Sequence, residues 1–349
     1  MGGNGKKSGD PLRGALLGFG NVALHAHLPV WQQSKHFKID SVVEPIPERR
    51  ELIKTVLPDA RIYADLDLLL EDGDVDFVDI CTPSSFHGEL MLRACRSGLH
   101  VFCEKPLFTS SGLLRQIEET GNRLHRALFV VNNWKYAPLW SRTLELIREG
   151  RIGKVRSVCL SVLRTPNSGG GISNWRQCAQ FAGGGILLDH GWHNLYLILS
   201  MMKERPLSLS AHMQYPQTQG SDLEDTVDLA MHFPRAEARL HLTWRADCRR
   251  NHGTIIGDLG TLAMGDDHLI LETGNGAPPV RYDFPEPLSK GSHHPQWMAQ
   301  VVESFRREIA DDKARGANFR EGKWCAHLIE LAYRSQLSGS CLLEVEDLL

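Results

Sequence analysis

The sequence has little that would point to a membrane protein, a nucleic-acid-binding protein or a disulfide-stabilised protein. No apolar run approaches the roughly 18 residues that a membrane-spanning helix needs. The net charge is −3, so no excess of basic side chains favours nucleic acid as a partner. The eight cysteines include no Cys-x-x-Cys pair, and Cys81, Cys95 and Cys103 lie in apolar contexts, which is typical of inert buried thiols in a reducing compartment. We therefore expect a cytoplasmic protein.

The chain of 349 residues is longer than one typical hydrophobic core, so two domains are expected. Residues 1–11 are Gly-rich and polar, without the apolar core of a signal peptide, and we expect a disordered tail there. Over residues 12–133, strand and helix patterns alternate, which predicts a parallel, doubly wound α/β sheet. Over residues 134–349, short strand patterns joined by tight turns, with helices at the end, predict a second domain built on an antiparallel sheet.

The stretch from Asp76 to Pro106 contains a complete strand–loop–helix–strand unit. An apolar strand over residues 77–81 stops at a polar break, a helix follows, and a second strand over residues 100–103 ends at Glu104 and Lys105. Ligands of open parallel sheets bind outside the carboxyl ends of the strands. A lysine at this place is therefore a candidate functional residue.

A second candidate site lies at the start of the chain, where Gly18-Phe19-Gly20-Asn21-Val22-Ala23 follows a predicted strand and opens a helix. The glycines allow a tight turn and close approach of a pyrophosphate to backbone N–H groups, and the helix N-terminus favours its negative charge. The next strand, residues 37–43, ends at Glu44, whose carboxylate suits a ribose 2′-hydroxyl and repels a 2′-phosphate. This pattern favours NAD over NADP, although Arg49 and Arg50 argue for a 2′-phosphate.

Asp189 and His193 are candidate catalytic residues because they lie four positions apart after a glycine triplet, a spacing that puts both on one helix face. An imidazole can accept the hydroxyl proton of an alcohol that loses a hydride near neutral pH. Our hypothesis makes His193 the acid/base, Asp189 its orienting carboxylate, and Lys105 the electrostatic and proton-relay partner. The sequence leaves open whether Lys105 or His193 is the main acid/base. His190 could add a metal ligand, but side chains at i, i+1 and i+4 converge poorly on one ion, so we expect no metal.

Three segments together resemble one known family: GFGNVALHAHLPVW, TPSSFHGELMLRACRSGLHVFCEKP and GGGILLDHGWHNLYLI. They are similar to the glucose-fructose oxidoreductase / inositol dehydrogenase (Gfo/Idh/MocA) family, over nearly the whole chain beyond the tail. The resemblance implies a Rossmann domain that binds a nicotinamide cofactor and a C-terminal α/β domain with a large, mostly antiparallel open sheet. It further implies a sugar, sugar derivative or inositol as substrate, and a homodimer or homotetramer.

The same resemblance assigns cofactor contacts to residues that match the family's motifs. These are Gly18, Gly20, Asn21 and Val22 at the pyrophosphate, Glu44 at the ribose, Thr82, Pro83, Ser84 and His87 along the crevice, Glu104 and Lys105 near the nicotinamide, and Asn133, Trp175 and Arg176. The sequence departs from the family's motifs at three places, which leaves the substrate identity open. Ala23 replaces the third glycine of the glycine motif, His190 follows Asp189 where an apolar residue is usual, and Trp134-Lys135-Tyr136 stands where an arginine is more usual.

Two alternatives on the same scaffold stay open. One is an NAD-dependent glycosidase-like enzyme that cleaves a glycosidic bond through transient oxidation. The other is a non-catalytic regulator that senses the cofactor. The retention of Lys105, Asp189 and His193 argues against the regulator, because a sensor has no need of all three side chains.

Overall fold

The computed structural model describes residues 10–166, 178–216, 222–291 and 293–348, so most of the expected tail lies outside the described residues. The chain forms two compact units. Unit 1 contains Met1–Val131 and His293–Arg320, and unit 2 contains Asn132–Ser292 and Glu321–Leu349. The chain therefore passes from unit 1 to unit 2, back to unit 1, and again to unit 2.

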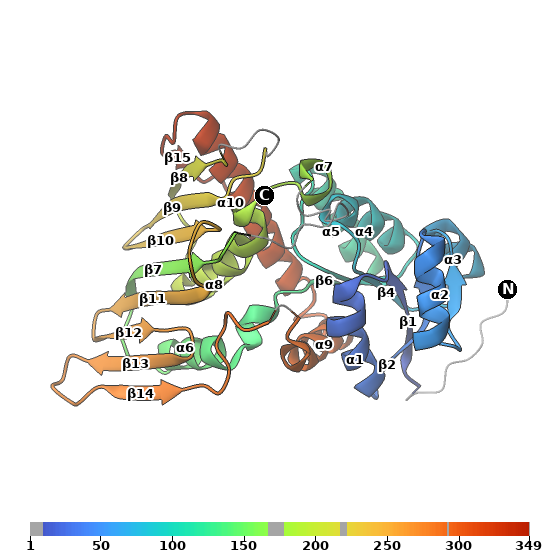
Figure 1. The fold of residues 1–349 in the computed structure, drawn as a ribbon, viewed down its shortest axis with the longest axis horizontal. Helices are drawn as coiled ribbons and strands as arrows, with labels where there is room; N and C mark the ends of the chain where they lie inside the picture. Colours follow the sequence, from blue (N-terminus) through green and yellow to red (C-terminus); the bar gives the residue numbers. More distant parts are fainter. Residues whose placement is uncertain (1–9, 167–177, 217–221, 292, 349) are drawn as a thin grey trace. The chain divides into compact units, whose positions relative to one another are not determined.

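Unit 1 is built on a six-stranded sheet in which every pair of neighbouring strands is parallel (Figure 1). The strands are β1 (Leu12–Leu17), β2 (Phe37–Val43), β3 (Arg61–Tyr63), β4 (Phe77–Ile80), β5 (His100–Cys103) and β6 (Leu128–Val130). Their order is β3-β2-β1-β4-β5-β6, which is the Rossmann order. The predicted doubly wound parallel sheet is confirmed. Because strand order reverses between β1 and β4, the loops after these strands meet at the place where such folds bind ligands.

Two helices of unit 1 begin at a side-chain cap. Asp65 accepts a hydrogen bond from Leu68 N–H at the start of α3, and Ser110 accepts one from Leu113 N–H at the start of α5. The elements are η1 (Ala23–His27), α1 (Leu28–Gln33), α2 (Pro47–Val56), α3 (Leu66–Asp72), η2 (Ser84–Phe86), α4 (His87–Arg96), α5 (Ser111–Leu124) and α9 (Pro295–Ala310).

Helix α9 belongs to unit 1 because of its aromatic side chain Phe305, which is fully buried. The Phe305 ring packs against one phenylalanine from each of β2, β4, β5 and β6, with ring centroids 5.2–5.9 Å apart: Phe37, Phe77, Phe102 and Phe129. Helix α9 also packs against α1 and η1. Periodicity in the sequence predicts a helix here but does not indicate which sheet the helix covers.

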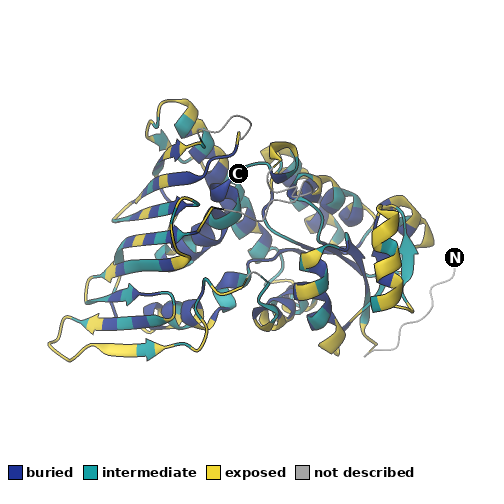
Figure 2. Ribbon diagram, in the orientation of Figure 1, coloured by how far each residue is buried: buried dark blue, intermediate teal, exposed yellow. Residues whose placement is uncertain are grey.

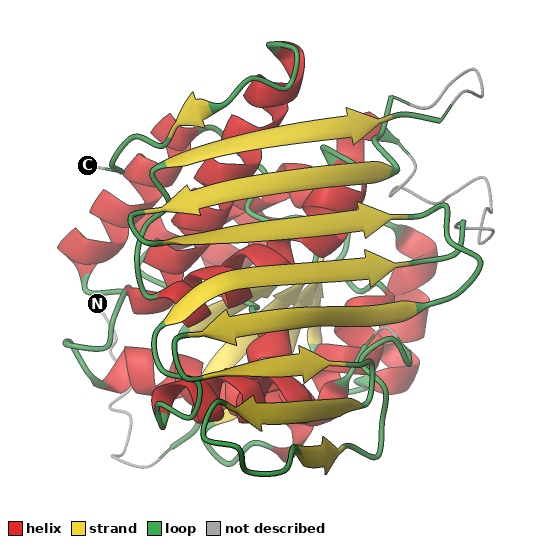
Figure 3. Ribbon diagram, turned by 90° about the vertical axis from the view of Figure 1, so that its left-hand side faces the viewer, coloured by secondary structure: helices red, strands yellow, loops and turns green. Residues whose placement is uncertain are grey.

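Unit 2 is built on a nine-stranded sheet, which faces the viewer in Figure 3. Its strand order is β14-β13-β12-β11-β7-β10-β9-β8-β15. All neighbouring strands are antiparallel except β7 and β10, so the predicted mostly antiparallel sheet is confirmed. The strands are β7 (Val155–Leu163), β8 (Ser208–Gln214), β9 (Thr226–Phe233), β10 (Ala236–Thr243), β11 (Arg250–Gly257), β12 (Gly260–Met264), β13 (His268–Thr273), β14 (Val280–Asp283) and β15 (Leu343–Glu344).

One face of this sheet is covered by helices of unit 2. Helix α8 packs on β7 and β10, and α6 packs on β13. Along β9, Val227, Leu229 and Met231 are buried while Asp228 and His232 are exposed, an alternation visible as coloured bands in Figure 2. The remaining elements are η3 (Asn133–Tyr136), α6 (Pro138–Arg148), α7 (Ala179–Ala182), η5 (Leu187–Gly191), α8 (Trp192–Met202) and α10 (Ala317–Leu337). Within the described residues, no helix combines the length and apolarity needed to cross a membrane.

We predict that Phe305→Ala destabilises the protein by about 3–5 kcal/mol, because it empties the centre of the aromatic cluster under the unit 1 sheet. The free energy of unfolding in urea measures this effect. Leu337→Ala is the matched control, since Leu337 is 87% exposed and its truncation should change stability by less than about 0.5 kcal/mol. Equal effects of the two substitutions would contradict the placement of α9 in the unit 1 core.

Candidate active site

The turn after β1 has the geometry that a dinucleotide needs. Gly18 has φ +87°, a conformation that favours glycine, and a Cβ there would lie 3.2–3.3 Å from Thr82 and from the backbone of Cys81. At Gly20, by contrast, no atom of the described residues lies within 4 Å of the Cβ position. The turn therefore packs tightly on its Gly18 side and is open at Gly20, and the helix begins directly afterwards at Asn21 and Val22.

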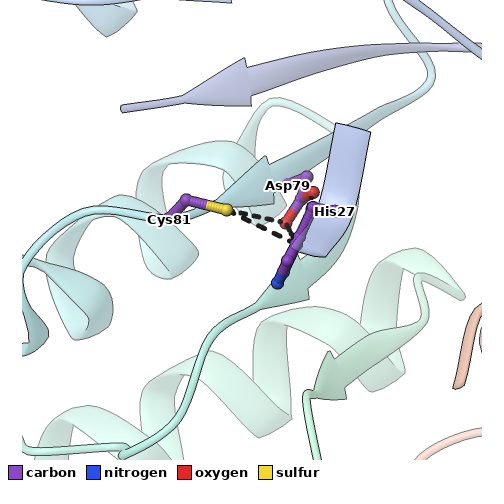
Figure 4. A group of neighbouring side chains, drawn as sticks. All are labelled: His27, Asp79 and Cys81. Atoms are coloured by element: carbon purple, nitrogen blue, oxygen red, sulfur yellow. Dashed lines mark hydrogen bonds and ion pairs between the residues drawn. The ribbon is translucent and has the colours of Figure 1, made fainter. Parts of the chain in front are cut away.

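This helix opens with a π-helical segment, η1, before it continues as α1. π-turns are rare and are often found at functional sites. His27 is the last residue of the segment, and its side chain is buried. Figure 4 shows the imidazole of His27 beside Asp79 of β4 and Cys81 just beyond that strand.

Both ring nitrogens of His27 face carboxylates. Nδ1–H donates to Asp79, with 2.8 Å to Oδ2 and 3.0 Å to Oδ1, and Nε2–H donates to Glu104 Oε1 at 2.8 Å. Trp31 Nε1–H also donates to Asp79 Oδ2, at 2.6 Å. A carboxylate only accepts hydrogen bonds, so an imidazole that lies between two of them carries hydrogen on both nitrogens. His27 is therefore an imidazolium that joins the end of β5 to β4.

The pKa shifts agree with this charge state. Burial is the largest single effect on the pKa of His27 and would lower it, but the charge of Asp79, its hydrogen bond and the interactions with Cys81 together outweigh burial and hold the pKa well above its usual 6.5. Burial is the largest single effect on Glu104 and opposes its ionisation, but the hydrogen bond from His27 and the nearby positive charges of His27 and Lys105 together outweigh burial and lower the pKa of Glu104 below its usual 4.5. Burial and then Asp79 raise the pKa of Cys81 to about 12, so this side chain stays a thiol.

One cluster in the described part of the chain has ligand atoms close enough together to hold a metal ion. It consists of His27, Asp79 and Cys81, whose ligand atoms all lie within 4.8 Å of one another. The set fits an ion poorly. His27 Nδ1 already shares a proton with Asp79, Cys81 is held as a thiol rather than the thiolate that metals bind, and Glu104 lies on the opposite nitrogen of the ring. We assign these residues a hydrogen-bonded, charge-pairing role.

The network continues into the motif that carries Lys105. Lys105 N–H donates to Glu104 Oε2 at 3.2 Å, so the carboxylate that holds His27 also holds the Lys105 backbone. His87 braces the neighbouring loops, since its ring nitrogens lie 2.9 Å from the carbonyl oxygens of Pro106 and Thr82. His87 was predicted to line the cofactor crevice. In the structure its nitrogens are engaged by backbone, so it shapes the loops after β4 and β5.

Glu44, the predicted ribose ligand, is buried at the end of β2. Its Oε2 accepts a hydrogen bond from Phe19 N–H at 2.8 Å, and its Oε1 accepts one from Ile46 N–H at 3.0 Å. A carboxylate offers about four lone pairs, so two stay available for hydroxyl groups. The bond to Phe19 ties Glu44 to the glycine turn, which is compatible with the predicted ribose contact.

Buried polar atoms without a partner among the described residues lie at Thr82 and Asn133, which the sequence analysis singled out, and at the neighbouring Ser85. In the described residues of unit 1, Thr82 Oγ1 and Ser85 Oγ have no hydrogen-bond partner, and in those of unit 2 the same holds for Asn133 Oδ1. Such atoms are rare in folded proteins and call for an explanation. A bound cofactor would provide one, and Gly18 lies directly beside Thr82. The residues of unit 1 therefore fit a dinucleotide. Pro83 and Ser84 belong to the same loop after β4 as Thr82.

In unit 2, the glycine triplet allows a buried carboxylate to cap the start of the next helix. Glu224 accepts hydrogen bonds from Gly185 N–H at 2.9–3.0 Å, from Leu187 N–H at 3.0 Å and from Tyr333 O–H at 2.9 Å. A Cβ at Gly185 would lie 2.0 Å from the Glu224 carbonyl oxygen, so only glycine fits. This capped end leads into η5, a second π-helical segment, and then α8.

The two segments carry the predicted catalytic pair of unit 2. Asp189 lies in η5, and its Oδ2 is 3.6 Å from Nε2 of His190. His193 lies in the first turn of α8, where its ring stacks on the indole of Trp134 with centroids 4.9 Å apart, and its Nδ1 is 2.9 Å from Tyr196 Oη. Lys105 belongs to unit 1 and this pair to unit 2. Trp175 and Arg176 lie outside the described residues.

Sequence reasoning missed four residues that organise these sites: His27, Asp79, Glu224 and Tyr196. One of them left a visible signal, because Asp79 is an acidic residue inside the apolar strand FVDI and must find a partner when buried. The other three residues gave no such signal. Their hydrogen-bond partners lie far away in the sequence, or they belong to a helix whose sequence is apolar on all sides.

Comparison with known proteins supports the class that the fold and site define, a dinucleotide-binding protein with a second α/β domain. Residues 12–132 match the oxidoreductase family with an NAD-binding Rossmann fold, and residues 140–263 match the GFO/IDH/MocA C-terminal domain. The chain therefore belongs to the GFO/IDH/MocA family of oxidoreductases.

Several curated proteins and solved structures are similar to the chain. It is 26% identical to D-glucoside 3-dehydrogenase of Escherichia coli over 53% of this chain and 52% of that protein, and 26% identical to inositol 2-dehydrogenase of Rhizobium meliloti over 57% and 58%. The matches span 52–63% of the length of the first curated relatives. The aldose-aldose oxidoreductase from Caulobacter crescentus shares the fold, with a TM-score of 0.81 and 22% identity over 96% of this chain and 100% of that one.

We predict that Gly185→Ala destabilises the protein by about 1–3 kcal/mol, because the added methyl group would force the Glu224 backbone away from the helix that it caps. Thermal unfolding measures the loss. Gly112→Ala in α5 is the matched control, since no described atom lies within 4 Å of its Cβ position and alanine favours helix by about 1 kcal/mol. If Gly185→Ala were as well tolerated as the control, the close approach of Glu224 would be wrong.

A second prediction concerns the pH dependence of stability. Because the pKa of His27 is raised on folding, its contribution is complete below pH 6.5 and is lost as the pH rises towards the folded value, at about 1.4 kcal/mol per pH unit. Because the pKa of Glu104 is lowered, its contribution is complete above about pH 4.5 and is lost at lower pH.

The stability difference between wild type and His27→Gln should therefore be largest between about pH 4.5 and 6.5, reaching about 3–5 kcal/mol, and should shrink above pH 6.5. Urea denaturation of both proteins from pH 5 to 9 measures it. A difference that stays constant over this range would mean that His27 is not an imidazolium in the folded protein.

Proposed function

We propose that the protein transfers a hydride between a nicotinamide cofactor and a hydroxyl-bearing carbon of a sugar, a sugar derivative or an inositol. The observation that carries this proposal is that a chain of an oxidoreductase family retains Lys105 directly after β5 and both Asp189 and His193 around the start of α8. The curated relatives named D-glucoside 3-dehydrogenase and inositol 2-dehydrogenase support this substrate class.

We propose NAD as the cofactor, in preference to NADP. Gly18, Gly20, Asn21 and Val22 would hold the pyrophosphate, because the turn is open at Gly20 and the helix presents its first N–H groups there. Glu44 would hold the adenosine ribose, because its carboxylate keeps two lone pairs and would repel a 2′-phosphate. Thr82 and Asn133 would contact it with the polar atoms that have no partner among the described residues.

When bound, the cofactor accepts or donates the hydride. The side chains of the protein bind the substrate oxygen and transfer its proton. Lys105 and His193 act on the substrate oxygen and its proton, and Asp189 orients a neighbouring group. The contact from Glu104 to Lys105 N–H fixes the backbone from which the lysine side chain starts. The cytoplasmic location, the homodimer or homotetramer and the domain limits at residue 133 stay predictions.

The test is a spectrophotometric screen at 340 nm of the purified protein with NAD or NADP against inositols, aldoses, amino sugars and uronates. We expect absorbance growth with NAD and at least one of these substrates. Growth with NADP alone would overturn the role of Glu44. Tight NAD binding without turnover of any substrate would overturn the dehydrogenase proposal.

Two variants separate the cofactor site from the chemistry. Gly20→Ala should leave the melting temperature within about 2 °C of wild type, because its side chain meets no described atom, and should weaken NAD binding at least about tenfold. Lys105→Met should bind NAD nearly normally and lose about 100-fold or more in turnover. Normal turnover in Lys105→Met would remove that residue from the mechanism.

A further inference from the structure

The hydrogen bonds around Tyr196 fix where one proton must lie. Tyr196 is fully buried in α8, and its Oη accepts a hydrogen bond from Trp134 N–H at 3.0 Å. The same Oη lies 2.9 Å from Nδ1 of His193, one helical turn earlier. A backbone N–H can only donate, so at Trp134 the tyrosine oxygen is the acceptor, and its own proton must be directed elsewhere.

The acceptor for that proton is His193 Nδ1. Burial raises the pKa of Tyr196 well above its usual 10, so the hydroxyl keeps its hydrogen. Within the described residues, Tyr196 Oη has no hydrogen-bond contact other than Trp134 N–H and His193 Nδ1. If Nδ1–H donated to Oη instead, two donors would converge on the oxygen and a buried O–H would be left without an acceptor.

The neutral imidazole has one hydrogen, and if Nδ1 accepts, then Nε2 carries it. The plane of the ring is held as well, because it stacks on the Trp134 indole with an interplanar angle of 12°. Trp134 thus contacts both partners: its N–H holds the tyrosine oxygen, and its side chain holds the imidazole plane.

We propose that Tyr196 fixes His193 as the Nε2–H tautomer, so that His193 donates a hydrogen bond to the substrate oxygen and does not accept its proton. This assignment rests on the proposed function and differs from our sequence-based hypothesis, in which His193 is the acid/base. Tyr196 is then a positioning residue and His193 a catalytic hydrogen-bond donor.

The proton balance follows from this assignment. When the secondary alcohol is oxidised, the C–H bond breaks with its electron pair, which leaves as hydride to the nicotinamide cofactor, and the O–H bond breaks as the C=O bond forms. The released proton goes to a base other than His193, which in the proposed function is the proton-relay partner Lys105. His193 keeps its Nε2–H throughout and stabilises the developing negative charge on oxygen. In the reverse direction the same group returns the proton.

The first experiment needs no substrate, so its result is independent of the proposed function. Histidine labelled with ¹⁵N in both ring nitrogens, observed by long-range ¹H–¹⁵N NMR at pH 8, shows which nitrogen is protonated. The His193 signals are assigned by their loss in His193→Gln. We expect hydrogen on Nε2 and none on Nδ1, and the opposite pattern would overturn the proposal.

Tyr196→Phe provides the variant for the same spectrum. Removing the hydroxyl should allow the Nδ1–H tautomer to appear at His193. Tyr282→Phe is the matched control, because Tyr282 lies in β14 and contacts Arg142 instead, and it should leave the His193 signals unchanged. An unchanged tautomer in Tyr196→Phe would overturn the role of Tyr196.

Kinetics with a substrate found in the screen test the donor role. The glutamine amide places an N–H near the position of Nε2 but cannot accept a proton. If His193 is a donor, His193→Gln should lose about tenfold in kcat and His193→Leu about 100- to 1,000-fold. If the two variants lose equally, His193 is a proton acceptor and the proposal fails. NAD affinity of both variants checks that each has folded.

Discussion

The imidazolium of His27 between Asp79 and Glu104 is the interaction on which the arrangement of unit 1 depends. It connects the helix after the glycine turn with β4 and with the end of β5, which are 52 and 77 positions further along the chain. The helix begins at the glycine turn, and the two strands end at the other loops of the proposed cofactor site. Because Glu104 also accepts from Lys105 N–H, a displacement of the helix would reach the lysine through only two hydrogen bonds.

In unit 2 a different buried carboxylate fixes the backbone near the candidate catalytic residues. Glu224 caps the helix start that leads to Asp189 and His193, and the glycine triplet lets the two backbones approach closely enough for this. In both units a π-helical segment precedes or contains the functional side chain, η1 with His27 and η5 with Asp189. A π-turn changes the direction of the side chains that follow it, so the i, i+4 geometry assumed from the sequence does not describe Asp189 and His193 directly.

Local patterns predicted most of the fold. The strands β2 and β5 were predicted with the observed limits, because apolar runs between turn residues mark them clearly. Strands β3, β14 and β15 were missed, since they are short or exposed and owe their pairing to neighbours. The glycine turn and Lys105 could be placed at strand ends from sequence alone. The roles of Tyr196 and Glu224 could not be predicted from the sequence, because each role depends on a hydrogen-bond partner that only the folded chain brings near.

The buried charges themselves argue for function. Removing a carboxylate and an imidazole from water costs more than their attraction usually returns, and well-packed apolar residues at such places are often as stable or more stable. Asp79 lies in an otherwise apolar strand with Trp31 packed beside it, so an apolar residue would suit the site. Stability alone therefore does not explain the set of His27, Asp79 and Glu104. What the set provides is a fixed direction for Glu104 and, through it, a fixed backbone at Lys105, which the proposed hydride transfer requires and folding does not.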